Sequence, residues 1–286
     1  MPMISRNLRA LCVSDPDKRR EALEEVLRRE EIPFILQEDA PSEKVPRGIR
    51  NYLFHTCGKT EETPDCAGAH TKYLFTAHYD AYPGSPGAND NAAAVCILTD
   101  LYHELLGRHI PAWFAFFDGE ENGHLGSKLY CDCMEPEDPK AAVNLDLCGF
   151  GDTIVLNAGG AELSRAFHPF CCRESLRCCA AQKVKFLPES DDVILRKAHL
   201  PTLSVSVVPR WDLQYLKSLS AMGEGLLGRS PEFRMIVSSM EVCATMHGGY
   251  RDNVEAVNPD NMQKVLDFLI RVLTGPVPAR SLRDFL

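Results

Sequence analysis

The sequence predicts an α/β fold in which one β-sheet lies between layers of helices. Short apolar runs typical of strands alternate along the chain with longer segments whose apolar residues recur at helical spacing. The run PAWFAFF, residues 111–117, is apolar throughout, as expected of a central strand covered on both faces. No internal repeat and no linker rich in Gly, Pro or Ser interrupts this pattern, so we expect one domain over residues 1–286.

The N-terminal part is predicted to begin with an amphipathic helix and to continue as strands. Residues 14–32 carry apolar side chains at helical spacing, and Ser14 is the expected N-cap. Short apolar runs then predict strands at 33–37, 51–55 and 72–80, a mostly buried helix at 92–108, and the central strand at 111–117.

The C-terminal part continues the alternation of helices and strands. Residues 211–246 separate the last clear strand from the segment HGGYRDN. We interpret them as a helical insertion near the functional site at the edge of the sheet. The final helix is expected to begin near Asn258 and to end at Gly275 and Pro276. The other expected elements are a short helix at 125–134, strands at 141–147 and 152–157, a helix at 161–181, a strand at 183–187, helical turns at 192–198 and a strand at 201–208.

Composition and charge exclude several classes of partner. The 286 residues are 45% hydrophobic, enough for a sizeable core. Forty acidic residues against 31 basic ones give a formal charge of −9, and no Lys/Arg run offers a face for phosphates, so we expect no nucleic-acid partner. The N-terminus lacks an apolar signal segment, and no stretch has the length of a membrane span. We therefore expect a cytoplasmic protein without a membrane partner.

The twelve cysteines fit neither a disulfide framework nor paired C-x-x-C zinc knuckles, and we expect them to be reduced. One group needs separate consideration, because His55, Cys57, Cys66 and His70 surround a polar turn between two predicted strands. Two interpretations stay open for this group: a structural zinc site and a plain surface hairpin.

Metal-capable side chains recur where the predicted strands end. The run KYLFTAHYD ends in His78 and Asp80, PAWFAFFDGEE in Glu120 and Glu121, and AAVNLD in Asp146. In an open α/β sheet, ligands bind beyond the carboxyl ends of the strands. We therefore expect these side chains to lie at one edge of the sheet.

Two more candidates lie outside these strands. Asp90 starts the helix after the first of them, and His247 in MHGGYRDN has no evident packing role. Two histidines and several carboxylates, without cysteine, form the nitrogen and oxygen set suited to catalytic zinc, with cobalt or manganese as substitutes. A catalytic zinc usually takes three protein ligands, so this set suffices for two ions that share a bridging carboxylate. The five candidates are His78, Asp90, Glu121, Asp146 and His247.

Four motifs, in this order, resemble the signature of the co-catalytic di-zinc aminopeptidases of the bacterial leucyl-aminopeptidase type, to which glutaminyl cyclases are related. The motifs are HYDAYPGSPGANDNAA, FFDGEENGHLGS, NLDLCG and MHGGYRDNVEAV, and the resemblance covers residues 72–275. It implies a mixed, mostly parallel sheet of about eight strands between helices. It also implies a metal-dependent exopeptidase that removes the N-terminal residue from a peptide or aminoacyl substrate.

The resemblance assigns the five candidate ligands to two zinc ions. His78 and Asp146 would bind one ion, Glu121 and His247 the other, and Asp90 would bridge both. It also implies a cis peptide bond between Asp90 and Asn91.

The resemblance assigns proton transfer to Glu120, which would take a proton from a metal-bridging water and pass it to the leaving amine. Asp80 would accept the second N–H of the His78 imidazole and fix its tautomer. Asp118 is expected to be structural, bonding to the loop that positions the two glutamates. In PESDDVILRKAHLP, Asp192 stands where relatives often have a histidine. Asp191 is then interpreted either as a residue that supports the ligands or as a helix cap.

Two other functions stay open. A glutaminyl-cyclase-like aminoacyltransferase works with one zinc, and Asp90, Glu121 and His247 would satisfy it. A non-catalytic binding protein on the same fold is the other alternative. The presence of His78 and Asp146 favours a two-metal enzyme over the one-zinc transferase. Glu120 argues against a non-catalytic protein, since such a protein needs no base beside its metal ligands.

Overall fold

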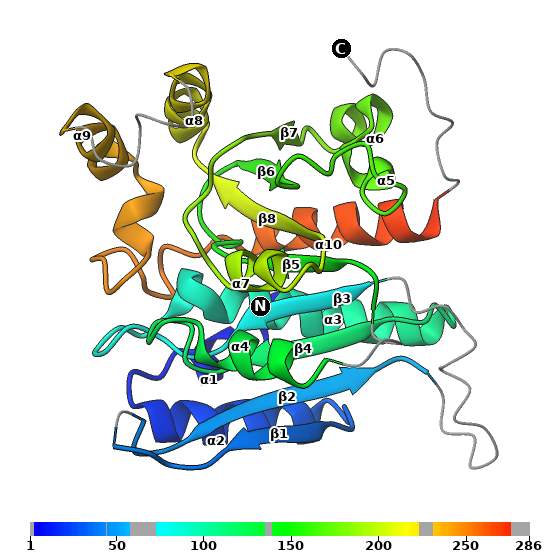
Figure 1. Ribbon diagram of the computed structural model, residues 1–286, viewed down its shortest axis with the longest axis vertical. Helices are drawn as coiled ribbons and strands as arrows, with labels where there is room; N and C mark the ends of the chain where they lie inside the picture. Colours follow the sequence, from blue (N-terminus) through cyan, green and yellow to red (C-terminus); the bar gives the residue numbers. More distant parts are fainter. Residues whose placement is uncertain (1–2, 44, 58–72, 135–138, 223–230, 276–286) are drawn as a thin grey trace.

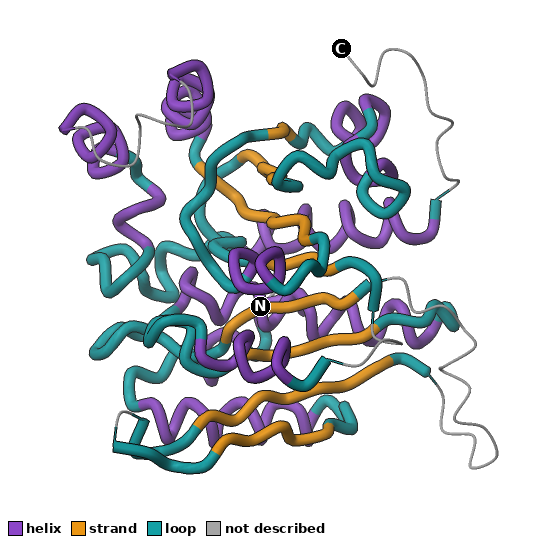
Figure 2. The backbone as a smooth tube through the Cα atoms, in the orientation of Figure 1, coloured by secondary structure: helices purple, strands orange, loops and turns teal. Residues whose placement is uncertain are grey.

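The computed structural model describes residues 3–43, 45–57, 73–134, 139–222 and 231–275. These residues contain one eight-stranded sheet in the order β1-β2-β4-β3-β5-β8-β6-β7 (Figures 1 and 2). Four neighbouring pairs are parallel and three antiparallel, which confirms the predicted mixed, mostly parallel sheet. The strands are β1 (Ile35–Asp39), β2 (Ile49–His55), β3 (Leu74–His78), β4 (Trp113–Phe117), β5 (Ala142–Leu145), β6 (Thr153–Asn157), β7 (Gln182–Lys183) and β8 (Thr202–Val208).

Helices cover both faces of the sheet. Figure 1 draws α4 and α7 in front of the strands and α3 and α10 behind them. The helices and helical turns are η1 (Met3–Ser5), α1 (Leu8–Leu11), α2 (Pro16–Arg29), η2 (Ala88–Ala92), α3 (Ala93–Gly107), α4 (Leu125–Asp132), α5 (His168–Cys171), α6 (Arg173–Cys178), α7 (Asp192–Lys197), α8 (Arg210–Met222), α9 (Pro231–Ser239), η4 (Val242–Thr245) and α10 (Pro259–Thr274). Within the described residues, no helix combines the length and apolarity that crossing a membrane requires.

The alternation of side chains along the central strands divides the core into two layers. In β4, Phe114 and Phe116 pack with α2, α3 and α10, whereas Ala115 and Phe117 pack with α4 and α7. Successive residues of a strand face opposite sides, and both sides are covered, so the strand is apolar throughout as predicted. A strand held on both faces gives a rigid support to the turn that follows it, where the two candidate glutamates lie.

The parallel strands β3, β4, β5 and β8 end at the same edge of the sheet. Figure 1 shows η4 and the segment after it on the side where these strands end. The described part of residues 211–246 is helical, as predicted, and α8 packs through Leu213 and Leu216 against Val155 and Val208 of the sheet. Residues close together in space at this edge therefore come from distant parts of the sequence.

The prediction of Ser14 as the first N-cap is wrong, because Asp15 caps α2. The Asp15 carboxylate accepts hydrogen bonds from the amides of Asp17 and Lys18 at 3.1 and 2.9 Å. Proline fits the first helical position, which here is Pro16, so the residue directly before it becomes the cap. The prediction for α10 is confirmed, since the side chain of Asn258 accepts from the Asp260 amide.

Two other predicted elements are shorter in the structure. The continuous helix expected over 161–181 is wrong: α5 and α6 are separated by Cys172, whose backbone is extended with ψ 153°. Pro169 has no amide to donate, so the first of these helices begins only at His168. The strand expected over 183–187 reduces to β7, an edge strand that pairs only with Val155 and Leu156 of β6.

The eleven cysteines among the described residues are free thiols. Of the group considered for a structural zinc, Cys66 and His70 lie outside the described residues, and that alternative stays a prediction. The His55 ring packs edge-on against Trp113, with their centroids 4.8 Å apart.

Glu30 ties the N-terminal segment to the end of α2. Its carboxylate accepts two hydrogen bonds from the Arg6 guanidinium, at 3.0 and 2.6 Å, and one from the Asn7 side chain at 2.9 Å. The hydrogen bonds from Arg6 are the main cause that lowers the pKa of Glu30 from 4.5 to about 2. Because the folded-state pKa is the lower one, this carboxylate stabilises the fold above about pH 4.5 and loses that effect as the pH falls towards 2.

We expect Glu30→Gln to lower the free energy of unfolding by about 1 to 2 kcal/mol at pH 7. The difference from the wild type should shrink as the pH falls from 4.5 towards 2, where the wild-type carboxyl is itself protonated. Urea unfolding of both proteins across this range measures it. Glu21→Gln, at an exposed position of the same helix, is the control and should show no such trend. If the difference in free energy of unfolding did not depend on pH, the ion pair between Glu30 and Arg6 would not be its cause.

Candidate metal centre

Three predicted ligands meet where β3 and β5 end. His78 is the last residue of β3, Asp146 directly follows β5, and Asp90 lies in the turn before α3. The His78 Nε2 atom is 3.1 Å from Asp90 Oδ1 and 3.6 Å from Asp146 Oδ1. One ligand atom from each residue lies within 4.8 Å of the other two. The strands are parallel neighbours, so their carboxyl ends bring His78 and Asp146 together, as the sequence predicted.

The backbone around Asp90 is fixed from two sides. The peptide bond between Asp90 and Asn91 is cis, as predicted. The Asn91 side chain donates to the carbonyl of Leu145 at 2.9 Å. Asp252, which is 2% exposed, accepts hydrogen bonds from the amides of Asn89 and Asp90 at 2.9 and 3.2 Å. Asp252 was not among the residues predicted from the sequence, although it stands five residues beyond His247 in the same motif.

The other two predicted ligands form a second pair beside the first. The His247 Nε2 atom is 3.9 Å from Glu121 Oε2. The backbone amide of His247 donates to Asp90 Oδ2 at 3.1 Å. One oxygen of Asp90 therefore contacts His78, and the other contacts the segment that carries His247. The His247 side chain is 60% exposed and marks the open side of the site.

Asp80 connects the end of β3 to the turn after β4. Its two oxygens accept hydrogen bonds from the amides of Glu120 and Glu121 at 3.0 and 3.1 Å. The predicted contact with His78 is longer, since Asp80 Oδ1 lies 3.4 Å from Nδ1 of the imidazole. Burial opposes ionisation of Asp80, but His78 and the two amides outweigh it and lower the pKa of the carboxyl. Asp80 thus fixes the backbone of both glutamates, an arrangement that the sequence did not indicate.

Burial raises the pKa of three of the carboxyl groups in the site. Burial raises the pKa of Glu120 to about 7, and burial together with the charge of Asp90 raises the pKa of Glu121 to about 9. Burial also raises the pKa of Asp146. For His78, burial opposes protonation, but the charge of Glu120 and the nearby aspartates hold its pKa well above the usual range. The site therefore favours positive charge.

The donor atoms of the site fit a zinc ion. His78 Nε2, Glu121 Oε1 and Asp146 Oδ1 are buried and have no hydrogen-bond partner within the described part of the chain. Buried polar atoms are normally paired, so unpaired ligand atoms on three of the five candidate residues indicate another partner. Imidazole nitrogen and carboxylate oxygen are the donors of catalytic zinc sites.

Asp118 has the structural role predicted for it, but with different partners. Its carboxylate is fully buried and binds Arg20 and Arg47 at 2.6 and 2.7 Å. It also accepts from the Arg50 amide at 3.2 Å. The expected bond to the glutamate loop is made by the backbone, since the Asp118 carbonyl accepts from the Gly126 amide at 2.7 Å. The carboxylate instead meets arginines from α2 and from the segment leading into β2.

Asp191 does not cap α7 with its side chain. Its Oδ1 accepts from the Ser127 hydroxyl at 2.6 Å and lies 3.8 Å from Nδ1 of His124. The same imidazole nitrogen lies 3.3 Å from Glu120 Oε1. His124 was given no role from the sequence, although it lies within the motif FFDGEENGHLGS.

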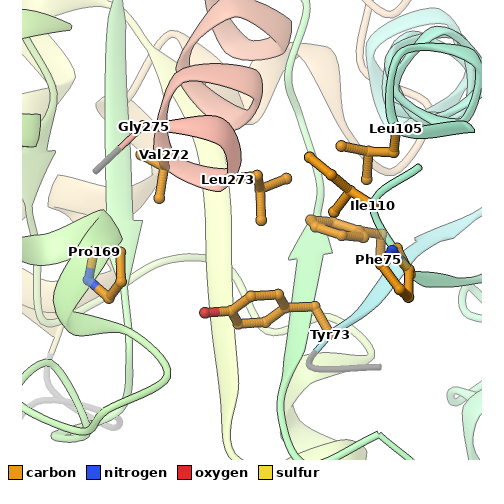
Figure 3. Close-up of a pocket in the computed structure, with 10 residues that line it drawn as sticks. Tyr73, Phe75, Leu105, Ile110, Pro169, Val272, Leu273 and Gly275 are labelled. Atoms are coloured by element: carbon orange, nitrogen blue, oxygen red, sulfur yellow. The ribbon is translucent and has the colours of Figure 1, made fainter. Parts of the chain in front are cut away.

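A separate apolar cavity of about 230 Å³ lies at the other end of β3 (Figure 3). Tyr73, just before this strand, and Phe75 line it together with Val272 and Leu273 near the end of α10. The Tyr73 hydroxyl already donates to the carbonyl of Ala166. This cavity offers no metal ligand and lies away from His78, at the opposite end of the same strand.

Known proteins resemble this chain in sequence over a short segment and in fold over most of its length. An 81-residue segment is 37% identical to aminopeptidase YwaD of Bacillus subtilis and covers 26% of this chain and 17% of that protein. The chain spans less than a fifth of the length of the curated relatives it matches. A glutaminyl cyclase of Porphyromonas gingivalis (TM-score 0.64, 15% identity) and a Zn-dependent exopeptidase of Parabacteroides distasonis (TM-score 0.62, 14% identity) have similar folds, each over 95% of both chains.

These two structural likenesses concern the fold alone, because both sequence identities are low. The family is shown by a sequence model, that of peptidase family M28, which matches residues 59–273. This range includes all five predicted metal ligands. The chain therefore belongs to peptidase family M28.

Proposed function

We propose that this chain is a zinc-dependent aminopeptidase that uses two zinc ions to hydrolyse the N-terminal residue from peptides. One observation carries the proposal: the tight set of His78, Asp90 and Asp146 stands beside a second pair, Glu121 and His247. A single catalytic zinc needs about three protein ligands, and the site offers five. Membership of peptidase family M28 and the local identity to an aminopeptidase support hydrolysis of a peptide bond.

In this proposal His78 and Asp146 would hold one ion, Glu121 and His247 would hold the other, and Asp90 would contribute to both. When bound, zinc supplies Lewis acidity that polarises the scissile carbonyl and lowers the pKa of water. Cobalt or manganese can take the same donor set. The acidic surroundings favour the cationic α-amine of a free N-terminus, in keeping with the formal charge of −9.

Glu120 acts as the general base. Its carboxylate is 8% exposed and stands outside the proposed ligand set, with a pKa raised to about 7 by burial. A base is most effective when its pKa lies near the working pH. It takes a proton from the attacking water and passes it to the leaving amine. Asp80 supports this step by holding the Glu120 and Glu121 amides.

A glutaminyl-cyclase-like transferase with one zinc is the second candidate. The fold does not separate the two, since a cyclase and an exopeptidase resemble this chain equally well. Asp90, Glu121 and His247 would serve a single ion. That reading leaves His78 and Asp146 without a metal to bind, although they belong to the tightest ligand set of the described residues. A non-catalytic protein would have no use for Glu120.

We further propose one domain over residues 1–286 with an insertion at 211–246 that flanks the site. We also propose a cytoplasmic location without a nucleic-acid or membrane partner. The continuous sheet, the acidic charge and the free thiols of the described cysteines support these proposals.

The proposal predicts activity against a panel of aminoacyl amides and dipeptides after loading with zinc, cobalt or manganese. We expect release of the N-terminal residue and two zinc ions per chain by mass spectrometry. N-acetylated forms of the same substrates are the control and should not be cleaved, because they lack the free amine. One zinc per chain, together with cyclisation of N-terminal glutamine, would instead identify the transferase.

A further inference from the structure

The His124 imidazole lies between the proposed general base and a second carboxylate that the proposed mechanism does not use. Its Nδ1 atom is buried, makes no hydrogen bond of regular geometry within the described residues, and lies 3.3 Å from Glu120 Oε1 and 3.8 Å from Asp191 Oδ1. Neither carboxylate is a proposed metal ligand. The His124 side chain is 22% exposed, whereas Asp191 is fully buried. The imidazole therefore links Glu120 to the interior of the protein.

The backbone holds His124 in this place. Its amide donates to the Glu120 carbonyl at 2.9 Å, which closes a tight turn between the two residues. Its φ of 59° is in the left-handed region, where few residues other than glycine occur. The Ser127 hydroxyl, one turn further along α4, lies 3.2 Å from the His124 carbonyl and 2.6 Å from Asp191 Oδ1. The turn, the helix and Asp191 thus form one hydrogen-bonded unit.

The charges in this unit complement one another. A buried carboxylate is costly unless a cation or several hydrogen bonds compensate it. Asp191 Oδ2 has no hydrogen-bond partner in the described structure, and His124 is the one cationic group there within 4.0 Å of Asp191. The contacts of His124 with Asp191 and then with Glu120 raise the pKa of the imidazole to about 10. The side chain is therefore protonated near neutral pH.

We propose that His124, anchored by Asp191, is a positioning residue that holds the Glu120 carboxylate in the orientation needed for proton transfer. This inference rests on the proposed function, because it assigns the proton transfer to Glu120. A glutamate side chain has several rotamers, and a cation at Oε1 selects those that keep this oxygen beside Nδ1. The other oxygen of Glu120 is then presented to the reacting water in a fixed direction.

The first test replaces His124 with glycine, which removes the imidazole and accepts the left-handed backbone. We expect kcat to fall by about 10- to 100-fold, the usual effect of losing a group that orients a functional side chain. KM and the zinc content should not change, because His124 contacts no proposed ligand. His109→Gly is the matched control, since the exposed His109 after α3 has a φ of 55°.

The second test is the conservative variant His124→Asn. Asparagine tolerates a left-handed backbone, and its side-chain amide can donate from a position near that of Nδ1. We expect it to recover part of the kcat lost in His124→Gly. Recovery no better than glycine would contradict a role that depends on a hydrogen-bond donor facing Glu120.

The double variant His124→Gly with Asp191→Asn separates positioning from charge compensation. If His124 only neutralises Asp191, removing both charges should restore the melting temperature and kcat together. If His124 positions Glu120, the melting temperature should recover while kcat stays about 10- to 100-fold low. Recovery of kcat to the wild-type value would overturn the proposal.

A readout without turnover keeps this inference distinct from the proposed function. In zinc-loaded protein labelled with ¹⁵N-histidine, the Nδ1 resonance of His124, assigned by its absence in His124→Asn, should shift on Glu120→Gln. His109 should not respond. An unchanged His124 resonance would overturn the proposed contact. A wild-type protein that shows this shift but cleaves no substrate would refute the aminopeptidase assignment and leave the contact standing.

Discussion

Glu120→Gln is expected to lower kcat by about 100- to 10,000-fold while the zinc content stays at the wild-type value. The glutamine side chain has the same shape but cannot accept a proton from water at neutral pH. None of the five proposed ligands changes, and the Glu120 amide still binds Asp80. Steady-state kinetics on a peptide substrate, with zinc measured by mass spectrometry on the same preparation, gives both quantities.

Glu121→Gln is the matched comparison, because it makes the same chemical change at a proposed metal ligand instead of the proposed base. Its Oε2 faces His247, and its Oε1 is one of the buried atoms without a hydrogen-bond partner in the described structure. We expect this variant to lose zinc, and activity with it. If Glu120→Gln lost the metal and Glu121→Gln kept it, the two roles would have to be exchanged.

The two adjacent glutamates can divide these roles because Asp80 fixes their backbone. Its two oxygens bind the two successive amides, at 3.0 and 3.1 Å, so each side chain leaves from a defined point. The Glu120 carboxylate then meets His124, and the Glu121 carboxylate meets His247.

Asp90→Asn is expected to remove metal binding. At the same concentration of added zinc, its activity should be lower than that of Glu120→Gln. Asp90 is the residue whose two oxygens contact both halves of the site, through His78 and through the His247 amide. An amide contributes no charge and only one oxygen donor, so neither proposed ion keeps its full set of ligands. Equilibrium dialysis against zinc and kinetics on one substrate measure the two effects.

Thermal unfolding distinguishes loss of the metal from loss of the fold. Zinc raises the melting temperature of a protein whose folded state binds it, and we expect this rise in the wild type but not in Asp90→Asn. Without zinc, the variant should unfold at or above the wild-type temperature, because one charge leaves a crowded group of carboxylates. Asp100→Asn in α3, whose side chain is also largely buried and binds Arg6, is the control and should keep the zinc response. A zinc response retained in Asp90→Asn would refute the bridging role.

Much of the candidate site could be predicted because the relevant signals are local in the sequence. An apolar run that ends in a histidine or carboxylate marks the end of a strand, and parallel neighbours such as β3 and β5 end at the same edge. This rule placed His78 and Asp146 together without any knowledge of distances. Asp90, Glu121 and His247 were also recognised as candidates from their residue types and places in the sequence, and the structure brings them to this edge. The resemblance then assigned the five candidates to two ions.

The parts that were missed depend on contacts between distant segments. Asp252 holds the Asp90 turn although the two residues are 162 positions apart in the sequence. The Asp118 side chain was assigned to the nearby glutamate loop but binds Arg20 of α2 and Arg47 of the segment before β2. Local sequence carries no signal for such partners, since any buried carboxylate can be satisfied by any donor that folding brings within reach.

The α/β class, the central strand and the types of donor atom follow from the sequence, because hydrophobic periodicity and side-chain chemistry are properties of the residues alone. The surroundings of the two glutamates, in contrast, come from tertiary contacts. Glu120 and Glu121 are chemically the same, and their difference arises from what faces each of them: an imidazole backed by Asp191 for one, and His247 for the other. That surrounding is built from the segments before α4, α7 and α10. Burial raises the pKa of both carboxyl groups, and the charge of Asp90 raises that of Glu121 further, to about 9 against about 7 for Glu120.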